Sequence, residues 1–365
     1  MRVKAAEAIV QIMVKEGITD AFGIPGAGIN PVYKYLENAP IAHYGMRHEE
    51  ACTHAADAYF RASHKIALAI CTAGPGATNF VTGLYTANID SIPLLAIVGQ
   101  ANTWQLSQDP FQCVDMVSIA DTVTKKVFRP MKAEEIPEMM REGKPGPVLI
   151  DFPLDVQMGE LEFDIDSYEP KEINKVMPDP EKIEKAIEML SEAENPLIIM
   201  GGGVRLAEAE EALIRFAEEY QIPVITTYMA KGGIPENHPL NAGHAGIQVG
   251  QPIGNKYLLD SDIVLGIGCR FSDRHTGDLK VYRGDRKFIH IDICESQIGK
   301  VFEPDLGIVS DAAEAIKLLE ETAKSKKLKN FSNERVAVLP VLREEMARKT
   351  DYDNVPIMPH RVFHE

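Results

Sequence analysis

The stretch KIALAICTAGPGATNF, residues 65–80, decides the fold, because an apolar run leads into the loop Gly74-Pro75-Gly76 and then into a helical pattern. A continuous apolar run is typical of a strand buried on both faces of a parallel sheet. Two more such runs, IPLLAIVGQ at 92–100 and GPVLIDFP at 146–153, follow with amphipathic segments around them. This alternation predicts an α/β domain over residues 1–157.

A second α/β domain is predicted over residues 181–322. Residues 158–180 are acidic and contain prolines, which is typical of a linker. Residues 323–365 are predicted to form a connector to a further domain. The fold class expected is therefore two doubly wound parallel-sheet domains, the second Rossmann-like. Its apolar strand candidates are NPLIIMGGGV (195–204), IPVITTYMA (222–230), DIVLGIGCRF (262–271) and RKFIHIDIC (286–294).

Composition excludes several classes of protein. The chain has 365 residues, 45% of them hydrophobic and 25% charged, as in a soluble globular protein of more than one domain. Its net charge of −16 argues against nucleic acid or an anionic membrane as partner. No apolar run reaches the roughly 18 residues of a membrane span. The N-terminus has the pattern of an amphipathic helix and not of a signal peptide. Five scattered cysteines without a CxxC pair predict reduced thiols and a cytoplasmic protein.

The segment RHEEACTHAADAYFRA, residues 47–62, places Glu49 in the first turn of a helix. Alanines recur at helical spacing after it, at 51, 55, 58 and 62, so we expect that face to be closely packed. A buried carboxylate followed by a glycine loop indicates a cofactor site. The alternatives are a solvated first-turn acid that the helix dipole favours, and a glycine loop that only makes a turn.

Several segments of the chain, in order, resemble thiamine-diphosphate-dependent carboligases, among them acetohydroxyacid synthase (acetolactate synthase) and glyoxylate carboligase. The resemblance implies a pyrimidine-binding domain followed by a central domain. The matching segments are residues 17–33, 47–62, 72–100, 109–116, 143–157, 201–204, 266–277, 290–300 and 304–312.

In this family a glutamate hydrogen-bonds the aminopyrimidine of thiamine diphosphate and promotes loss of the C2 proton, and the matching residue is Glu49. A carboxyl with a raised pKa suits that role. Glu50, turned about 100° around the helix, is expected to face elsewhere. The resemblance places six residues at the cofactor: Gly26, Gly74, Pro75, Gly76, Thr78 and Asn79. It places four along the substrate channel, with ordinary structural roles as the alternative: Gln100, Phe111, Gln112 and Lys125.

The central domain of both relatives holds FAD, largely as a structural cofactor, although the glycine fingerprints here are incomplete. Leu206 stands where the run Gly201-Gly202-Gly203 would need its third glycine, and Phe271 follows the second motif. The resemblance adds candidates for the FAD phosphates (Arg270, Arg274), the ribose or ring (Asp292) and the adenine end (Asp311), while Arg270, Asp273 and Arg274 could instead form an ion-pair cluster. Lys144 stands where acetohydroxyacid synthases have arginine. Lysine keeps the positive charge but lacks the planar guanidinium group that can donate two parallel hydrogen bonds.

Two features of the sequence depart from the family pattern and bear on the reaction. The segments at 275–277, 304–312 and 353–362 resemble glyoxylate carboligase, yet the best-known enzyme of that type has valine where this chain has Glu49. We therefore predict condensation of two glyoxylates to tartronate semialdehyde and CO2. The alternatives are an acetolactate synthase, which joins two pyruvates, and a non-catalytic FAD-binding or regulatory subunit. A dehydrogenase using NAD is disfavoured by the broken fingerprints.

The second departure concerns the cofactor's diphosphate. The family binds magnesium through a motif that begins GDG, and neither Gly277-Asp278-Leu279 nor Gly284-Asp285-Arg286 fits it. No metal ligand is therefore expected within these residues. We expect the diphosphate-binding domain to follow residue 365 or to come from a separate chain, so that this polypeptide alone is inactive. A homodimer or tetramer is implied by the resemblance.

Overall fold

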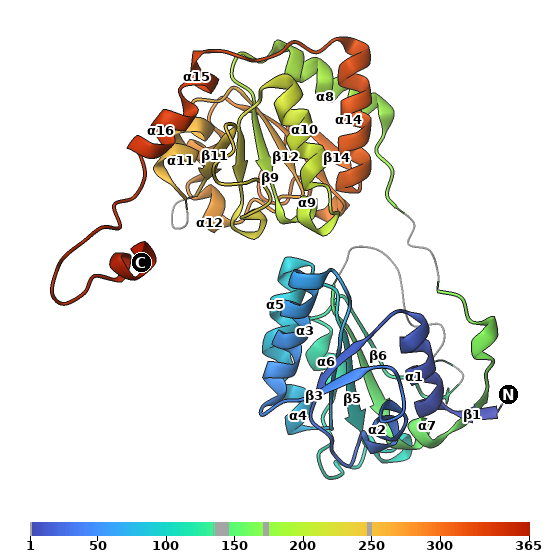
Figure 1. Cartoon of the computed structure of the whole chain (residues 1–365). Coiled ribbons are helices and arrows are strands. Elements are labelled where there is room, and N and C mark those ends of the chain that lie inside the picture. The colour runs from blue at the N-terminus through green and yellow to red at the C-terminus, as the bar shows by residue number, and fades with distance from the viewer. Residues whose placement is uncertain (1, 134, 136–145, 171–174, 247–249) are drawn as a thin grey trace. The chain divides into compact units, whose positions relative to one another are not determined.

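The computed structural model describes residues 2–133, 135, 146–170, 175–246 and 250–365. The chain divides into two compact units, Met1–Ile173 and Asn174–Glu365 (Figure 1). The division falls inside the segment 158–180 that the sequence marks as a linker.

The first unit contains a six-stranded parallel sheet in the order β3-β2-β4-β5-β7-β6. The predicted apolar runs form its three central, fully or almost fully buried strands. The shorter strands escaped prediction because β3 is exposed throughout at the sheet edge and β2 alternates in burial. The bounds are β2 (Asp20–Gly23), β3 (Ala42–Gly45), β4 (Leu68–Cys71), β5 (Leu95–Gln100), β6 (Lys126–Phe128) and β7 (Val148–Pro153).

Helices cover both faces of this sheet (Figure 1). On one face α1, α2 and α7 pack together, and Ile9 and Met13 of α1 are buried with Ile70 and Ile97 of the sheet. Burying each such side chain contributes about 1.5–3 kcal/mol. On the other face α3 and α5 pack together. The bounds are α1 (Ala5–Lys15), α2 (Asn30–Leu36), α3 (Glu49–Ser63), α4 (Pro75–Thr78), α5 (Val81–Asp90), η1 (Thr103–Gln105), α6 (Met116–Ala120) and α7 (Leu154–Met158).

Part of the segment 158–180 belongs to the first unit. The strand β8 (Glu160–Glu162) pairs antiparallel with β1 (Arg2–Lys4), and η3 (Ile165–Ser167) follows it. Leu161 and Phe163 are buried in the first unit's core. These two apolar side chains are what anchors an otherwise acidic stretch.

The second unit contains a six-stranded parallel sheet in the order β11-β10-β9-β12-β13-β14. One face packs on α8, α10 and α14, the other on α11, α13 and α16. The strands are β9 (Leu197–Met200), β10 (Val224–Thr226), β11 (Asn241–His244), β12 (Ile263–Ile267), β13 (Lys287–Asp292) and β14 (Leu306–Val309). The helices are α8 (Pro180–Glu192), α9 (Gly202–Leu206), α10 (Glu210–Tyr220), η4 (Tyr228–Ala230), α11 (Pro252–Leu259), α12 (Asp273–Thr276), α13 (Leu279–Arg283), η5 (Glu295–Gln297), α14 (Ala312–Lys326), α15 (Glu334–Ala337), α16 (Leu339–Glu345) and α17 (Pro359–His364).

The strand orders confirm two doubly wound α/β domains and locate their ligand crevices. In such sheets the chain reverses its direction of winding at a switch point, and ligands bind outside the carboxyl ends of the two strands there. The switch point lies between β2 and β4 in the first unit and between β9 and β12 in the second. Within the part of the chain that is described, no helix is long and apolar enough to cross a membrane.

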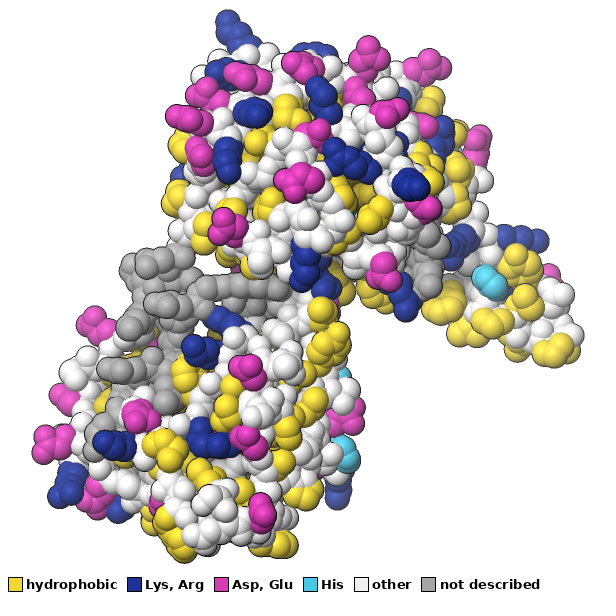
Figure 2. Space-filling view, turned by 180° about the vertical axis from the view of Figure 1, so that it is seen from behind, with side chains coloured by type: hydrophobic (Ala, Val, Ile, Leu, Met, Phe, Trp, Pro, Cys, Tyr) yellow, Lys and Arg dark blue, Asp and Glu magenta, His cyan; other side chains and the backbone are white. Residues whose placement is uncertain are grey.

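The expected packing of the alanine face of α3 is wrong. Its buried residues are Cys52, Thr53, Ala56, Asp57 and Phe60, whereas Ala58 and Ala62 are exposed. The close contact of α3 with α5 is made on a different face, where a Cβ on Gly83 would lie 2.1 Å from Oγ1 of Thr53. Yellow apolar side chains are visible on the side of this unit that carries these helices (Figure 2), and Tyr85 and Ile89 of α5 are exposed.

Candidate functional site

Glu49 begins α3 at the carboxyl edge of the first sheet. The helix starts here because His48 is extended and its Nδ1 accepts a hydrogen bond from the backbone N–H of Glu50, at 3.2 Å. Glu49 is half-buried, and Nδ2 of Asn79 donates to its Oε2 at 2.9 Å. A Cβ on Gly76 would lie 3.3 Å from the other oxygen, Oε1. The structure thus brings Glu49, Gly76 and Asn79 together, as the sequence predicted.

The carboxylate of Glu49 influences two buried thiols. Burial and, to a smaller extent, the negative charge of Glu49 raise the pKa of Cys52 to about 12. Burial, followed by the charges of Cys52 and Glu49, raises the pKa of Cys71 well above its ordinary value. Both cysteines therefore stay protonated thiols and are unsuited to nucleophilic chemistry.

The glycine loops at this switch point are shaped by Thr72, which the sequence analysis missed. A Cβ on Gly26 would lie 2.6 Å from Cβ of Thr72, and the backbone N–H of Gly28 donates to Oγ1 of Thr72 at 3.3 Å. Its position between the end of β4 and the predicted Gly74 loop was the available signal. The remaining loop residues, Pro75 and Thr78, are exposed.

Gln112 and Gln100 lie at the same carboxyl edge but in different surroundings. Gln112 packs on the cofactor loop, because a Cβ on Gly74 would lie 2.6 Å from its carbonyl oxygen. Phe111 beside it is 89% exposed. Gln100, only 2% exposed, donates through Nε2 to the carbonyl of Val114 at 2.8 Å and to both carboxylate oxygens of Asp151 at 3.2 Å.

Lys125 lies apart from the other predicted residues. It precedes β6, which runs parallel to β7 and β5, so it stands at the amino edge of the sheet. A Cβ on Gly146, which precedes β7, would lie 3.0 Å from its Cβ. Within this unit Lys125 is thus at the edge opposite Glu49.

A buried ionic network beside Gln100 was also missed. Nε of Arg129 lies 2.6 Å from Oδ2 of Asp151, and Nη2 lies 3.1 Å from Oδ1 of Asp115. Burial raises the pKa of Asp151 to about 6, although the Arg129 guanidinium opposes this shift. An isolated aspartate in an apolar strand carries no sequence signal for its partners, which come from other strands and loops.

In the second unit, glycines after β9 and β12 press against one another. A Cβ on Gly201 would lie 2.0 Å from the carbonyl oxygen of Gly268, and one on Gly268 would lie 2.6 Å from Cα of Gly203. Gly268 also has a positive φ of 60°. A Cβ on Gly202 would be 3.1 Å from Cβ of Met229. These glycines are therefore required by backbone packing at the switch point.

The other FAD candidates follow the carboxyl ends of neighbouring strands. Arg270 follows β12 and is half-buried, whereas Asp273 and Arg274 in α12 are exposed. Asp292 ends β13, is 8% exposed, and its Oδ1 accepts from the N–H of Cys294 at 2.9 Å. Asp311 caps α14 by accepting from the N–H groups of residues 313 and 314. Lys144 lies outside the described residues.

Two buried histidines stand near these loops. Burial lowers the pKa of His275 and of His290 to about 4, so both are neutral at pH 7. Nε2 of His275 lies 2.9 Å from the hydroxyl of Tyr282, while no hydrogen-bond partner is found among the described residues for its Nδ1 or for Nε2 of His290. The ring of Phe271 packs 4.8 Å from His290, centroid to centroid.

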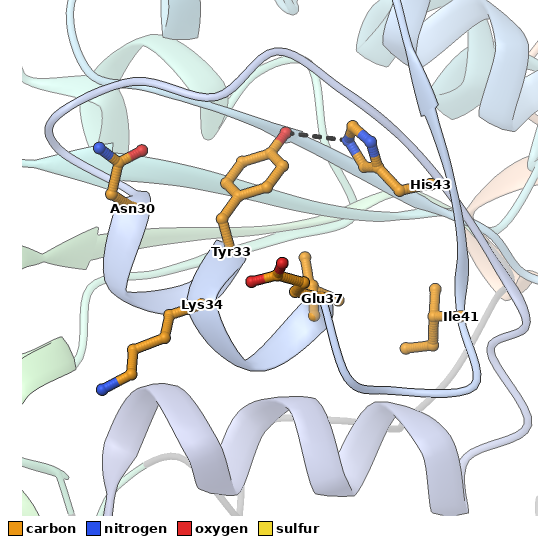
Figure 3. Close-up of a pocket in the computed structure, with 7 residues that line it drawn as sticks. Asn30, Tyr33, Lys34, Glu37, Ile41 and His43 are labelled. Carbon is orange, nitrogen blue, oxygen red and sulfur yellow. Dashed lines mark hydrogen bonds between the residues drawn. The ribbon is translucent and has the colours of Figure 1, made fainter.

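A surface pocket of about 600 Å³ lies between α2 and β3, away from the predicted residues (Figure 3). Tyr33 and His43 point toward each other there, with 3.1 Å between the hydroxyl and Nε2. Among the described residues no cluster of three or more His, Cys, Asp or Glu side chains is placed to hold a metal ion. All five cysteines are free thiols. The pocket is lined by Asn30, Tyr33, Lys34, Leu36, Glu37, Ile41 and His43.

Each of the two units matches a known protein family. Residues 3–119 match the thiamine pyrophosphate (TPP) enzyme N-terminal TPP binding domain, and residues 183–319 match the central domain of the same enzymes. The chain is 45% identical to glyoxylate carboligase of Escherichia coli O157:H7, in an alignment covering 100% of this chain and 63% of that protein.

Two further relatives carry a different name. The chain is 40% identical to the probable acetolactate synthase large subunit of Methanocaldococcus jannaschii, covering 98% of this chain and 62% of that protein. It is 39% identical to the acetolactate synthase large subunit of Corynebacterium glutamicum, covering 97% and 58%. The chain thus spans about three fifths of the length of these relatives. It belongs to the thiamine pyrophosphate enzymes of the carboligase type, with their N-terminal TPP binding domain and central domain.

Proposed function

We propose that this chain is part of a carboligase that removes CO2 from one 2-oxo acid and joins the remaining fragment to a second 2-oxo acid. The observation that carries the proposal is the position of Glu49. Asn79 orients its carboxylate beside the side-chain-free Gly76, at the switch point of the TPP-binding domain. A half-buried, oriented carboxylate in such a crevice suits proton transfer.

The residues present fit the pyrimidine half of thiamine diphosphate. A planar ring needs a surface without side chains, and Gly26, Gly74 and Gly76 carry none. An added Cβ would lie 2.6 Å from Thr72, 2.6 Å from Gln112 and 3.3 Å from Glu49, respectively, so each position leaves little room for a side chain. Thiamine diphosphate, when bound, supplies the nucleophilic carbon and the electron sink for decarboxylation. Pro75, Thr78 and Asn79 would complete the loop that holds the pyrimidine.

The chain's own contribution to the chemistry is the handling of one proton. Asn79 donates to Oε2 of Glu49, which leaves Oε1 on the side of Gly76 as the atom that accepts or donates a proton. Phe111 and Gln112 extend from the loop packed on Gly74 and would contact the 2-oxo acid, with Gln100 beneath them. Lys125 remains a proposed substrate residue only if another element brings substrate to its edge of the sheet.

For the substrate we propose glyoxylate, with tartronate semialdehyde and CO2 as products. The relative with 45% identity is named glyoxylate carboligase, whereas the two acetolactate synthases above share 40% and 39%. Pyruvate, giving acetolactate, is the second candidate, because Glu49 matches the acetohydroxyacid synthase pattern.

Further proposals concern cofactors and assembly. The second unit would hold FAD around Gly201, Arg270, Asp292 and Asp311, because these residues lie at the carboxyl edge of its sheet. A neutral flavin contact is also compatible with the unpartnered Nε2 of His290. Magnesium would accompany the diphosphate outside these residues. We propose a homodimer or tetramer in the cytoplasm.

The test is a product analysis of the protein purified from its own source, with thiamine diphosphate, Mg²⁺ and FAD added. Tartronate semialdehyde from glyoxylate supports the proposal, and acetolactate from pyruvate supports the second candidate. Loss of CO2 from neither acid, in a preparation that binds thiamine diphosphate, would overturn both and leave a non-catalytic binding subunit.

A further inference from the structure

The loop between β5 and α6 holds an unusual backbone conformation beside the candidate site. Asp109 and Gln112 both have positive φ values, 47° and 58°. Residues other than glycine adopt this region at a cost, and they persist in it only where surrounding contacts impose it. Something in the structure must therefore hold residues 109–115 in place.

The first contact is with the cofactor loop. Gly74, itself at a φ of 61°, lies so close to Gln112 that an added Cβ would be 2.6 Å from its carbonyl oxygen and 2.9 Å from its Cα. The conformation of Gln112 and that of the Gly74 loop are therefore coupled through backbone packing.

The second contact is a clamp behind the loop. Nε2 of Gln100 donates to the carbonyl of Val114, and Arg129 pairs with Asp115. Gln100 and Arg129 both bind the same buried carboxylate, Asp151, which is completely inaccessible to solvent. Two successive loop residues, Val114 and Asp115, are thus linked to one side chain of the first unit's sheet.

We propose that Asp151 is a positioning residue: through Gln100 and Arg129 it holds the 109–115 loop against Gly74 and thereby presents Phe111 and Gln112 to the site at Glu49. The part that concerns catalysis rests on the proposed function. The loop-holding role stands on the contacts alone.

The charge state of Asp151 bears on the clamp. Burial raises its pKa to about 6, against the effect of Arg129 and the hydrogen bond from Gln100, and the neighbouring Asp115 raises it slightly. Cys113 and Asp109 also face this cluster; burial raises the pKa of Cys113, which is a neutral thiol. Protonation of Asp151 removes its ion pair with Arg129, so the clamp weakens as the pH falls through about 6.

The experiment is hydrogen exchange of the backbone amides of residues 109–115 in the purified full chain. We expect Asp151→Asn to raise their exchange rates by roughly tenfold or more, because local opening is no longer opposed by the ion pair. Asp115→Asn, a change at a residue whose side chain is 60% exposed, should raise them less and leaves the buried pair intact. It is the second variant should Asp151→Asn fail to fold.

Asp57→Asn is the matched control. Arg61 lies between Asp57 and Asp90 at 2.8 and 2.9 Å, as Arg129 lies between Asp151 and Asp115, and Asp57 is 6% exposed. Loss of the Asp57 carboxylate should loosen the packing of α3 on α5 but leave the exchange rates of the 109–115 amides as in the wild type. Unchanged exchange in both clamp variants, or equal effects of the control on this loop, would overturn the positioning role.

Turnover of the complete enzyme separates this inference from the proposed function. We expect Asp151→Asn to raise KM for the 2-oxo acid by roughly tenfold with a smaller loss of kcat, and to remove the decline of kcat/KM below pH 6. A wild-type enzyme without turnover refutes the proposed function while the exchange data still decide the clamp. Wild-type kinetics in a variant whose loop exchanges faster would refute the presentation of Phe111 and Gln112.

Discussion

The two units share a doubly wound design but differ in what stands at the switch point. Between β2 and β4 a half-buried carboxylate, Glu49, lies beside glycines. Between β9 and β12 the glycines Gly201, Gly203 and Gly268 instead press against one another. The order of strands determines where a ligand binds, whereas the side chains decide whether the place supports proton transfer or only binding.

The electrostatics of the two units are also opposite. In the first unit burial raises the pKa of Asp151 to about 6. In the second, burial lowers the pKa of His275 and His290 to about 4. Both effects disfavour the charged form, but they have opposite consequences for stability as the pH changes.

The largest expected effect is on catalysis at the first switch point. Glu49→Gln should lower kcat of the complete enzyme by roughly 10²- to 10⁴-fold, because the amide cannot transfer a proton. The matched control is Glu50→Gln, whose side chain is 43% exposed and faces His48 and His54. Steady-state turnover of glyoxylate and pyruvate is the measurement, and equal rates for the two variants would remove the chemical distinction between the units.

Next in size is backbone packing at the second switch point. Gly268→Ala should lower the free energy of unfolding by about 3 kcal/mol or more, because strain at positive φ adds to a collision with Gly203. Gly232→Ala is the control, since Gly232 has a φ of 85° and no atom within 4 Å of an added Cβ. It should cost about 1 kcal/mol from strain alone. Similar losses in urea unfolding for the two variants would contradict the proposed contact.

Lowering the pH should change the stability of the two units in different ways. Because the folded pKa values of His275 and His290 lie below 6.5, the unfolded chain binds more protons, and stability is lost as the pH falls from about 6.5 toward 4. Each histidine should cost about 2 kcal/mol between pH 6.5 and about 5. The contribution of Asp151 to the free energy of unfolding has the opposite sign, because burial of its ionised carboxylate outweighs the ion pair with Arg129. This contribution is fully present below pH 4 and is lost as the pH rises through about 6.

Segment-resolved exchange can test this difference. Unfolding of the first unit is followed by the fluorescence of Trp104, the only tryptophan in the sequence, and that of the second by exchange in β12 and β13. His290→Phe should reduce the acid sensitivity of β12 and β13, whereas replacing the exposed His360 by Phe should not. The same acid sensitivity in the two units would show that the buried histidines do not set it.

The smallest expected effect concerns the cap of α14. Asp311→Ala should cost about 1 kcal/mol, because the N–H groups of residues 313 and 314 lose their acceptor, while Asp311→Asn keeps the cap. Thermal unfolding measures this cost. A loss of FAD affinity in the asparagine variant at unchanged stability would show that the carboxyl edge of the second sheet binds the cofactor beyond its switch point.

In the first unit the strands that are buried on both faces could be predicted, and the partly exposed ones could not. β4, β5 and β7 are buried on both faces, so their sequences are continuously apolar. β2, β3 and β6 each contain partly buried or exposed positions, so their sequences lack a continuous apolar run. The alanine face of α3 failed as a packing signal because small residues also tolerate solvent.

The candidate site residues were predicted where the resemblance to a known family supplied them. Glu49, Gly76 and Asn79 were all named in advance and lie in contact. Thr72 and the clamp around Asp151 were missed, because their partners come from strands and loops as far as 51 residues away. The residues that a buried polar side chain contacts in the folded chain are not marked by any periodicity in the sequence.

The amino-acid sequence alone was sufficient for the two parallel-sheet domains, because continuous apolar runs mark strands that are buried on both faces. The family and the choice of Glu49 came from the resemblance of whole segments to known carboligases. The folded chain was needed to show that Gly201, Gly203 and Gly268 pack on one another whereas Gly76 lies beside Glu49, and that Lys125 stands at the opposite edge from Glu49. It also decided the pKa values of Asp151, His275 and His290. These depend on desolvation and on charges brought together from distant segments, which only the folded chain produces.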